Sequence, residues 1–228
     1  MEIYQPKIFG VIGLGIFGMT LAKQLSKANR EVIVLDRNEE KLKEARQFTD
    51  YAYVCEHLTK EAMCEAGIED CDVVVICIGE QMDTSILTAL YVQSLGVKKV
   101  FAKATSLEHG IILEKMGVEP LFPEQEAATW TARFMVSRNL LDYIPISEDI
   151  ELAKIQVSEK LIGHSVAGID FRQSFGLNII ALEHNGEAST EINPHYIFQT
   201  GDVIFAIGKN QHIRNLEDMM HNNKSRFE

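Results

Sequence analysis

Three glycines, Gly13, Gly15 and Gly18, lie in the spacing G-x-G-x-x-G near the start of the chain. The apolar run Lys7–Ile12 precedes them, and a helical pattern that ends near Ala28 follows. In this strand–turn–helix context the first glycine allows a tight turn, the second lets a phosphate approach the backbone, and the third lets the helix pack on the strand. The N–H groups and the dipole of the helix start then attract an anion.

A carboxylate follows at the end of the next apolar run, where Asp36 closes the segment Glu31–Asp36. At this position a carboxylate accepts hydrogen bonds from ribose hydroxyls and repels a 2′-phosphate. The glycine spacing, its flanking elements and the downstream acid together predict a nucleotide site. The alternative is a tight turn that binds nothing.

The residues that could perform catalysis form no recognisable set. The histidines of the second half are scattered, without the helical spacing of metal ligands: His164, His184, His195 and His212. Neither G-x-S-x-G, typical of a serine nucleophile, nor G-x-x-x-x-G-K-[ST], typical of a P-loop, is present. A nucleotide site without such groups favours a sensor over an enzyme. A small NAD-dependent oxidoreductase and a redox-sensing regulator remain the alternatives.

The composition of the chain further limits the classes of protein to which it could belong. The 228 residues carry a net charge of −11, which argues against a nucleic-acid partner because such a protein needs a basic face. The cysteines form no C-x-x-C, as is typical of reduced thiols in a cytosolic protein: Cys55, Cys64, Cys71 and Cys77. We find neither the ~18 continuous apolar residues of a membrane helix nor a signal peptide, so we expect a cytoplasmic protein.

Strand-like and helix-like runs alternate through the first half of the chain, and six strands are expected. They are Lys7–Ile12, Glu31–Asp36, Tyr51–Val54, Asp72–Ile78, Lys98–Ala104 and Val118–Leu121. Such alternation predicts an α/β fold with a Rossmann-like, doubly wound parallel sheet. The glycine loop would then lie at the carboxyl edge of that sheet.

A long helix is expected over Glu124–Tyr143, just after Pro123. Its apolar residues exceed a single stripe, which favours a helix that also packs on a partner subunit. Beyond it, short strands and one helix predict a second, smaller α+β domain, with a hairpin turn at Asn185-Gly186. These elements are Ala153–Val157, Asn178–His184, Val203–Ile207 and the helix Gln211–Met220. We place the two domains at residues 1–144 and 145–228.

Several stretches resemble the RCK family, whose members combine a TrkA-N with a TrkA-C domain and regulate Trk/Ktr-type bacterial potassium transporters. The first domain resembles it in VIGLGIFG, Asp36, VVVICIG, Lys103-Ala104-x-x-x-x-His109 and Phe122–Glu124. The second resembles it in Leu161-x-Gly163, Ile169-Asp170-x-Arg172, Gly176-x-Asn178-Ile179-Ile180-Ala181, Asn193-Pro194 and Gly201-Asp202-Val203.

The resemblance implies a non-enzymatic, cytoplasmic regulatory subunit that lies at the inner face of the membrane. Its partner would be a membrane potassium-transport subunit of the KtrB or TrkH type. It implies homodimers that assemble into rings, often octamers. An adenine nucleotide, either ATP and ADP or NAD and NADH, would bind in each first domain and shift the equilibrium between ring shapes.

The resemblance also assigns site residues. Nucleotide contacts fall on Gly13, Leu14, Gly15, Ile16, Phe17, Gly18, Asp36, Arg37, Asn38, Glu56, His57, Ile78, Gly79, Lys103, Ala104, Thr105 and His109. Glu124 matches an acidic position that helps to hold a divalent cation, Mg²⁺ or Ca²⁺. Cyclic di-AMP binds the second domain of some relatives, and the matching stretches contain Arg172, Asn178, Ile179 and Pro194.

The chain departs from the family pattern at Ile16. Ktr-type relatives carry an arginine there that reaches the γ-phosphate, and isoleucine cannot neutralise phosphate charge. The sequence therefore leaves open ADP, AMP, a dinucleotide, or a γ-phosphate partner from elsewhere.

Overall fold

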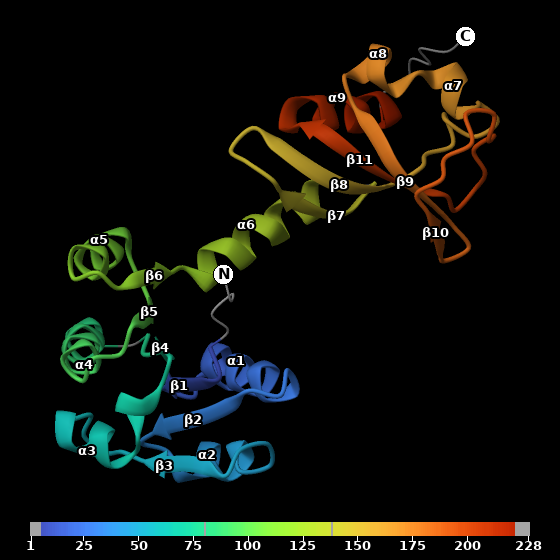
Figure 1. Cartoon of the computed structure of the whole chain (residues 1–228). Coiled ribbons are helices and arrows are strands. Elements are labelled where there is room, and N and C mark those ends of the chain that lie inside the picture. The colour runs from blue at the N-terminus through green and yellow to red at the C-terminus, as the bar shows by residue number, and fades with distance from the viewer. Residues whose placement is uncertain (1–5, 80, 138, 222–228) are drawn as a thin grey trace, which may run out of the picture. The chain divides into compact units, whose positions relative to one another are not determined.

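The computed structural model describes residues 6–79, 81–137 and 139–221 of the chain (Figure 1). The chain divides into two compact units, one that ends at Glu126 and one that begins at Ala127. None of the described helices is long and apolar enough to cross a bilayer.

The first unit is built on a six-stranded sheet in the order β3-β2-β1-β4-β5-β6. Every neighbouring pair is parallel, which confirms the predicted doubly wound fold. Because the strand order reverses between β1 and β4, their carboxyl ends flank the crevice where such sheets bind ligands. The strands are β1 (Ile8–Ile12), β2 (Glu31–Asp36), β3 (Tyr51–Val54), β4 (Val73–Ile76), β5 (Lys99–Lys103) and β6 (Glu119–Leu121).

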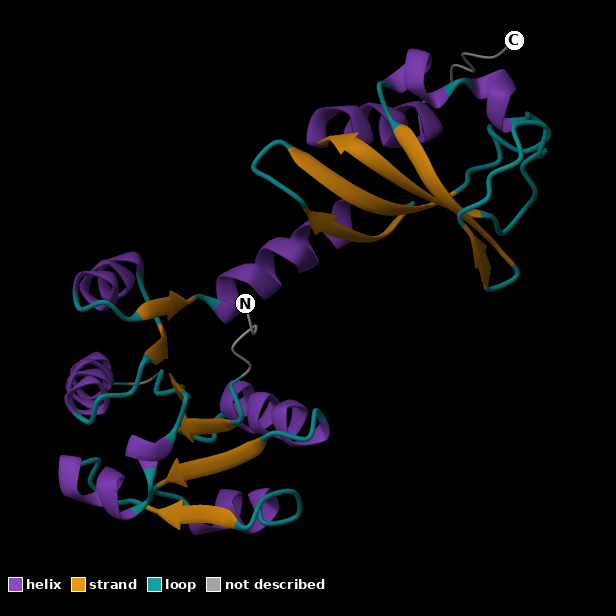
Figure 2. Cartoon of the chain, in the orientation of Figure 1, coloured by secondary structure: helices purple, strands orange, loops and turns teal. Residues whose placement is uncertain are grey.

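Helices cover both faces of this sheet (Figure 2). One face packs on α1 (Ile16–Lys27) and α2 (Glu39–Ala45) through a core that includes Ala22 and Leu42. The other face packs on the remaining helices through Met63, Ala89 and Leu113. These helices are α3 (Lys60–Glu65), α4 (Met82–Ser94) and α5 (Leu107–Lys115), with the short 3₁₀ helix η1 (Ile68–Asp70) after α3.

Two polar side chains cap the helices that follow β2 and β3. Asn38 accepts a hydrogen bond from Glu40 N–H at 2.9 Å, and Thr59 accepts one from Ala62 N–H at 3.2 Å. Such caps satisfy the N–H groups that the first turn of a helix leaves unpaired. The carboxyl ends of β2 and β3 are thereby joined to α2 and α3 with fixed geometry.

The predicted helix Glu124–Tyr143 is too long. Helix α6 spans Pro123–Val136, and Leu140–Pro145 form strand β7, which pairs antiparallel with β8. Beyond the helix, the Ser137 hydroxyl accepts the Leu140 N–H at 3.0 Å, and pairing with β8 satisfies the backbone of the segment that follows. The compact units therefore separate within the first turns of α6, whereas the domain division at residue 144 stays a prediction.

The second unit holds a five-stranded antiparallel sheet in the order β10-β9-β11-β8-β7. The hairpin at Asn185-Gly186 is confirmed, since both residues have positive φ, 51° and 83°. The sequence did not reveal the four- and five-residue helices α7 (Val166–Ile169) and α8 (Phe171–Phe175). The other elements are β8 (Ile150–Gln156), β9 (Asn178–His184), β10 (Glu187–Ser189), β11 (Val203–Lys209) and α9 (Asn210–His221).

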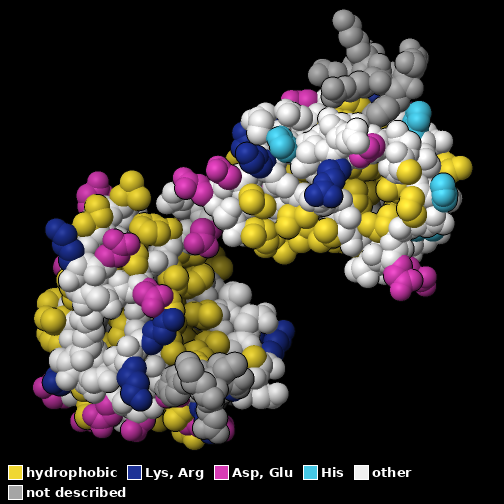
Figure 3. All heavy atoms as spheres, turned by 45° about the horizontal axis from the view of Figure 1, so that its top comes forward, with side chains coloured by type: hydrophobic (Ala, Val, Ile, Leu, Met, Phe, Trp, Pro, Cys, Tyr) yellow, Lys and Arg dark blue, Asp and Glu magenta, His cyan; other side chains and the backbone are white. Residues whose placement is uncertain are grey.

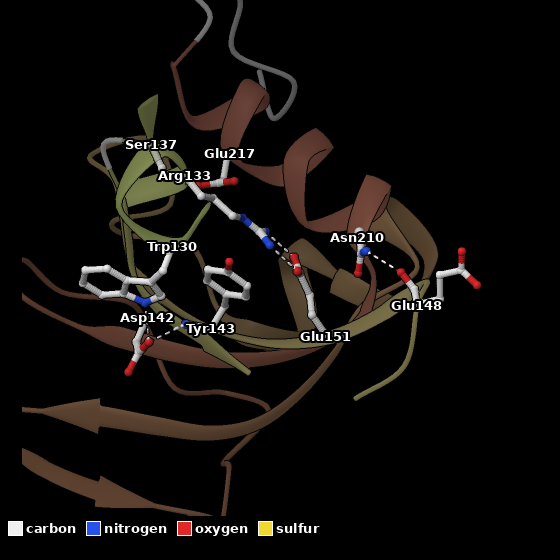
Figure 4. Close-up of polar contacts among 9 residues, drawn as sticks. All are labelled: Trp130, Arg133, Ser137, Asp142, Tyr143, Glu148, Glu151, Asn210 and Glu217. Carbon is white, nitrogen blue, oxygen red and sulfur yellow. Dashed lines mark hydrogen bonds and ion pairs between the residues drawn. The ribbon is translucent and has the colours of Figure 1, made fainter. Parts of the chain in front are cut away.

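A buried ion pair holds the end of α6 in the second unit (Figure 4). Both terminal guanidinium nitrogens of Arg133, Nη1 and Nη2, donate to the carboxylate of Glu151, whose side chain is 2% exposed. These hydrogen bonds raise the pKa of Arg133, and its guanidinium lies 4.1 Å from the centre of the Tyr143 ring. The Ser137 hydroxyl donates to Glu217 beside it. Paired and hydrogen-bonded in this way, the buried charge of Glu151 is compensated.

A second buried carboxylate, Asp202, organises the turn that leads into β11. It is fully buried and accepts hydrogen bonds from Tyr196 Oη at 2.9 Å and from Gln199 N–H at 2.8 Å. His184 Nδ1 lies 2.6 Å from the same carboxylate. Burial raises the pKa of Tyr196 to about 12, and the hydrogen bond to Asp202 adds to the shift. The hydroxyl of Tyr196 is therefore a stable donor to this carboxylate.

Candidate functional site

The glycine loop lies between β1 and α1, at the carboxyl edge of the parallel sheet. Gly13 has φ +95°, and its N–H donates to Leu35 O at 2.7 Å. A Cβ at Gly18 would lie 2.0 Å from Gly13 O and 3.1 Å from the Cβ of Cys77. The first glycine is therefore needed for its backbone conformation, and the third because the helix touches the loop.

The second glycine leaves a space in front of the helix. A Cβ at Gly15 would meet nothing within 4 Å, and Gly15 caps α1 without any side-chain hydrogen bond. The first turn of α1 contains no acidic residue, so no carboxylate of its own competes for these N–H groups. Ile16, the first residue of the helix, is 93% exposed. This geometry suits an anion at the start of α1.

Asp36 fixes the glycine loop by a hydrogen bond and also lies at the predicted nucleotide site. One oxygen accepts the Leu14 N–H at 2.5 Å, and the other accepts the Asn38 N–H at 2.8 Å. The residue is 9% exposed, and Lys41 Nζ lies 3.8 Å from it, a neighbour that the sequence did not indicate. Each carboxylate oxygen has a second lone pair, so Asp36 keeps the capacity to accept from a ribose hydroxyl.

Lys103 ends β5 at the same edge of the sheet. Its ammonium group would lie 3.3 Å from a Cβ placed on Gly79, which lies in the loop just after β4. It donates a hydrogen bond to Glu124 in the first turn of α6, and this bond lowers the pKa of Glu124. The described residues group no three His, Cys, Asp or Glu side chains that could hold a metal. Glu124 of this chain would therefore supply only part of a cation site.

His109 is covered by protein. Its side chain is 0% exposed, its Nδ1 accepts the Thr105 N–H at 3.3 Å, and burial lowers its pKa. Within the described chain its Nε2 has no hydrogen-bond partner. Ala104 is buried beside it, with its N–H donated to Leu121 O at 2.8 Å. His109 thus fixes the turn after Lys103, with Thr105 exposed at the tip of that turn.

The remaining first-unit residues surround Asp36 and the loop. Arg37, Glu56 and His57 are exposed, and Cys55 N–H donates to Asp36 O at 3.0 Å, which brings the segment after β3 beside Asp36. Ile78 lies on the other side of the loop, where a Cβ on Gly13 would be 3.5 Å from its side chain. The half-buried Phe17 packs against the core below α1. The structure therefore brings the predicted nucleotide residues to one edge.

The second-unit residues are less clearly gathered. Arg172 is exposed in α8, Asn178 is exposed at the start of β9, and Ile179 is half-buried against the core. Pro194 O accepts the Ala167 N–H at 2.9 Å. Among the residues that the structure describes, no hydrogen bond joins any two of the four predicted effector residues.

The thiols are poor nucleophiles. Burial raises the pKa of Cys71 and of Cys77 to about 12, and it also raises the pKa of Cys55. Cys64 is exposed, but its hydrogen bond with Glu69 raises its pKa as well. Because the thiolate is the reactive form, these surroundings do not favour the redox-sensing alternative.

Both halves of the chain match known domain families. Residues 9–122 match the TrkA-N domain family, and residues 150–221 match the TrkA-C domain family. The Ktr system potassium uptake protein C of Bacillus subtilis is 32% identical over 203 residues, which cover 89% of this chain and 92% of that protein. The Ktr system potassium uptake protein A of Bacillus subtilis is 28% identical over 93% of this chain and 96% of that protein.

Solved structures share the fold. The GsuK RCK domain aligns with 96% of this chain at a TM-score of 0.65 and 16% identity. A GsuK channel bound to NAD aligns with 97% of this chain at a TM-score of 0.62 and the same 16% identity. This chain spans 50% of the first of those chains and 40% of the second. With matching families over both halves and a 32% identical relative over nearly its whole length, the chain belongs to the TrkA-N and TrkA-C domain family that includes the Ktr potassium uptake proteins.

Proposed function

We propose that the protein is a cytoplasmic, nucleotide-binding regulatory subunit of a potassium uptake system. It would act at the inner face of the membrane, on a KtrB- or TrkH-like ion-transport subunit, without catalytic turnover. The observation that carries the proposal is the open, uncapped start of α1 at Gly15, which lies at one sheet edge with Asp36 and Lys103. Homology to Ktr potassium uptake proteins over both halves supplies the transport context.

The proposed ligand is an adenine nucleotide. Asp36 favours a free ribose over a 2′-phosphate, which is compatible with ATP, ADP, NAD or NADH. Lys103 supplies a positive charge for phosphate, a role that Ile16 cannot fill. A Mg²⁺ or Ca²⁺ ion between Glu124 and the phosphates, and cyclic di-AMP at Arg172 and its neighbours, are further proposals that rest on the family resemblance.

Calorimetric titration of the full chain with ATP, ADP, NAD and NADH tests the proposal, and Asp36→Asn sharpens it. We expect the variant to weaken ADP binding about tenfold, because ribose hydroxyls lose a charged acceptor. The affinity for 2′,3′-dideoxy-ADP, which lacks those hydroxyls, should not change. An equal loss for both ligands would mean that Asp36 only shapes the loop at Leu14. If the wild type binds none of the four nucleotides, the proposed function is wrong.

Exposed apolar side chains support a homo-oligomer, proposed as a dimer and an octameric ring. On α6 no residue is buried, and Trp130 and Phe134 stack at 5.4 Å between ring centroids while 42% and 46% exposed. Further apolar side chains are exposed on α4 and α5, and Figure 3 shows such side chains gathered on the visible surface. Those on α4 and α5 are Met82, Leu87, Leu90, Leu107, Ile111 and Ile112. Apolar faces of this kind mark protein contacts.

Phe134→Glu tests the role of α6. We expect light scattering at micromolar concentration to show at least a dimer for the wild type and a shift towards monomer for the variant. Burying a charge in place of an aromatic anchor costs an interface about 2 kcal/mol or more. Thr131→Glu adds the same charge at another exposed position of the helix and should change the mass less. A monodisperse wild-type monomer would exclude α6 as a strong dimer element.

A further inference from the structure

The ion pair between Lys103 and Glu124 places a carboxylate where a phosphate is expected. The Lys103 side chain is 16% exposed, whereas that of Glu124 is 68% exposed. The Lys103 side chain is therefore mostly packed against protein, whereas the Glu124 side chain is mostly in solvent and contacts Lys103 from there. Glu124 is the second residue of α6, so its movement needs no change in the sheet.

The ammonium group of Lys103 lies close to the glycine loop. It is beside Gly79, and its charge acts on Cys77. The Cβ of Cys77 in turn lies 3.1 Å from the place of a Cβ on Gly18. Lys103 at the end of β5 and Gly18 in α1 thus both lie beside the segment Cys77–Gly79 that follows β4. A phosphate held at the helix start could there also meet the ammonium group.

We propose that Glu124 is the resident anion of the phosphate site: its carboxylate pairs with Lys103 in the empty protein, and a nucleotide phosphate takes its place. The inference rests on the proposed nucleotide function, and it adds that the Glu124 carboxylate competes with the nucleotide phosphate for Lys103. A ligand must bring its own negative charge to Lys103 in order to displace Glu124. The exchange therefore lowers the affinity for phosphorylated adenosine relative to a site that lacks Glu124, and it leaves the affinity for adenosine unchanged.

The exchange also reports on the ligand. Glu124 belongs to the first turn of α6, and α6 continues to Arg133, which is fixed on Glu151. When phosphate occupies Lys103, the carboxylate of Glu124 is released at the start of this helix. At this position the helix dipole still stabilises the negative charge of Glu124, and the carboxylate can bind a divalent cation. Phosphate binding at Lys103 thereby breaks the ion pair between Lys103 and Glu124 at the start of α6.

Titration of the full chain with ADP in the presence of EDTA tests the exchange. We expect Glu124→Gln to bind ADP about twofold to fivefold more tightly than the wild type, because one exposed ion pair no longer competes. The gain should shrink at high salt, which screens exposed charges. If Glu124 acted only as a cation ligand, the variant would bind ADP in EDTA no better than the wild type, and this result would overturn the inference.

The sheet offers a matched control. Lys99 and Glu119 form an ion pair of 3.5 Å at the starts of β5 and β6, the edge opposite the glycine loop. Glu119→Gln removes the same charge and should leave ADP affinity unchanged. In a Lys103→Met background, Glu124→Gln should give no gain, and a gain that persists there would also contradict the exchange. If the wild type binds none of ATP, ADP, NAD and NADH, the proposed function itself is wrong.

Discussion

Gly18→Ala is expected to destabilise the first unit by about 2–4 kcal/mol and to abolish measurable ADP binding. The new Cβ would lie 2.0 Å from Gly13 O, and a backbone atom cannot swing aside as a flexible side chain can. Either α1 must move away from the glycine loop or Gly13 must leave its positive φ. Urea denaturation followed by circular dichroism measures the first effect, and calorimetry the second.

Gly15→Ala is the matched variant, because its Cβ meets no protein atom within 4 Å. We expect stability within about 1 kcal/mol of the wild type, since alanine is only a poorer helix cap than glycine. ADP binding should nevertheless fall about 10- to 100-fold, because the methyl group occupies the path of the phosphate. Equal binding by Gly15→Ala and the wild type would contradict a phosphate at the start of α1.

Asp202→Ala should have the largest effect on the second unit, a loss of about 3–5 kcal/mol in the free energy of unfolding. The fully buried carboxylate accepts hydrogen bonds from Tyr196 and Gln199, and alanine would leave these donors without their partner. The chain has one tryptophan, Trp130, and it lies in the second unit. Its fluorescence during urea denaturation therefore reports on the unit that Asp202 stabilises.

Two variants bracket this result. Asp202→Asn keeps an acceptor oxygen for Tyr196 and should lose less stability than the alanine variant. Asp218→Ala removes a carboxylate from an exposed position of α9 and should stay within about 0.5 kcal/mol of the wild type. If Asp202→Ala denatures at the same urea concentration as Asp218→Ala, the buried network does not stabilise the turn before β11.

The first sheet could be predicted because local patterns and tertiary structure agree there. The apolar run of the predicted strand Asp72–Ile78 is typical of a strand buried on both faces, and the structure buries all four residues of β4. Asn38 and Thr59 were recognisable as helix starts because their side chains cap their own helices. The right-handed connections of parallel sheets then place the glycine loop at the carboxyl edge of the sheet.

The region after α6 could not be predicted in the same way. Leu140, Leu141 and Ile144 have spacings that suit a helical face as well as a strand, and residues 124–143 therefore looked continuous. Pairing with β8, which is more distant in the chain, decides for a strand. The short helices α7 and α8 escaped because four or five residues carry too little periodicity to detect.

The candidate site shows the same limit. The spacing of the glycines and Asp36 encodes contacts between neighbouring strands, so their common location followed from the motif. The burial of His109 and the pairing of Lys103 with Glu124 depend on how β5, β6 and α6 pack. No spacing in the sequence specifies those contacts, although the resemblance marked each of the three residues as part of the site.

Each of the two compact units is an uninterrupted stretch of chain, and the first is complete at residue 126. During synthesis at ~5–20 residues per second, the remaining roughly 100 residues take about 5–20 s, while domains near the N-terminus already fold as units. The glycine loop, Asp36 and Lys103 can therefore be in place on the ribosome before the antiparallel sheet of the second unit exists. Nucleotide in the cell would then stabilise the nascent first unit by mass action, and the regulatory ligand would also assist folding.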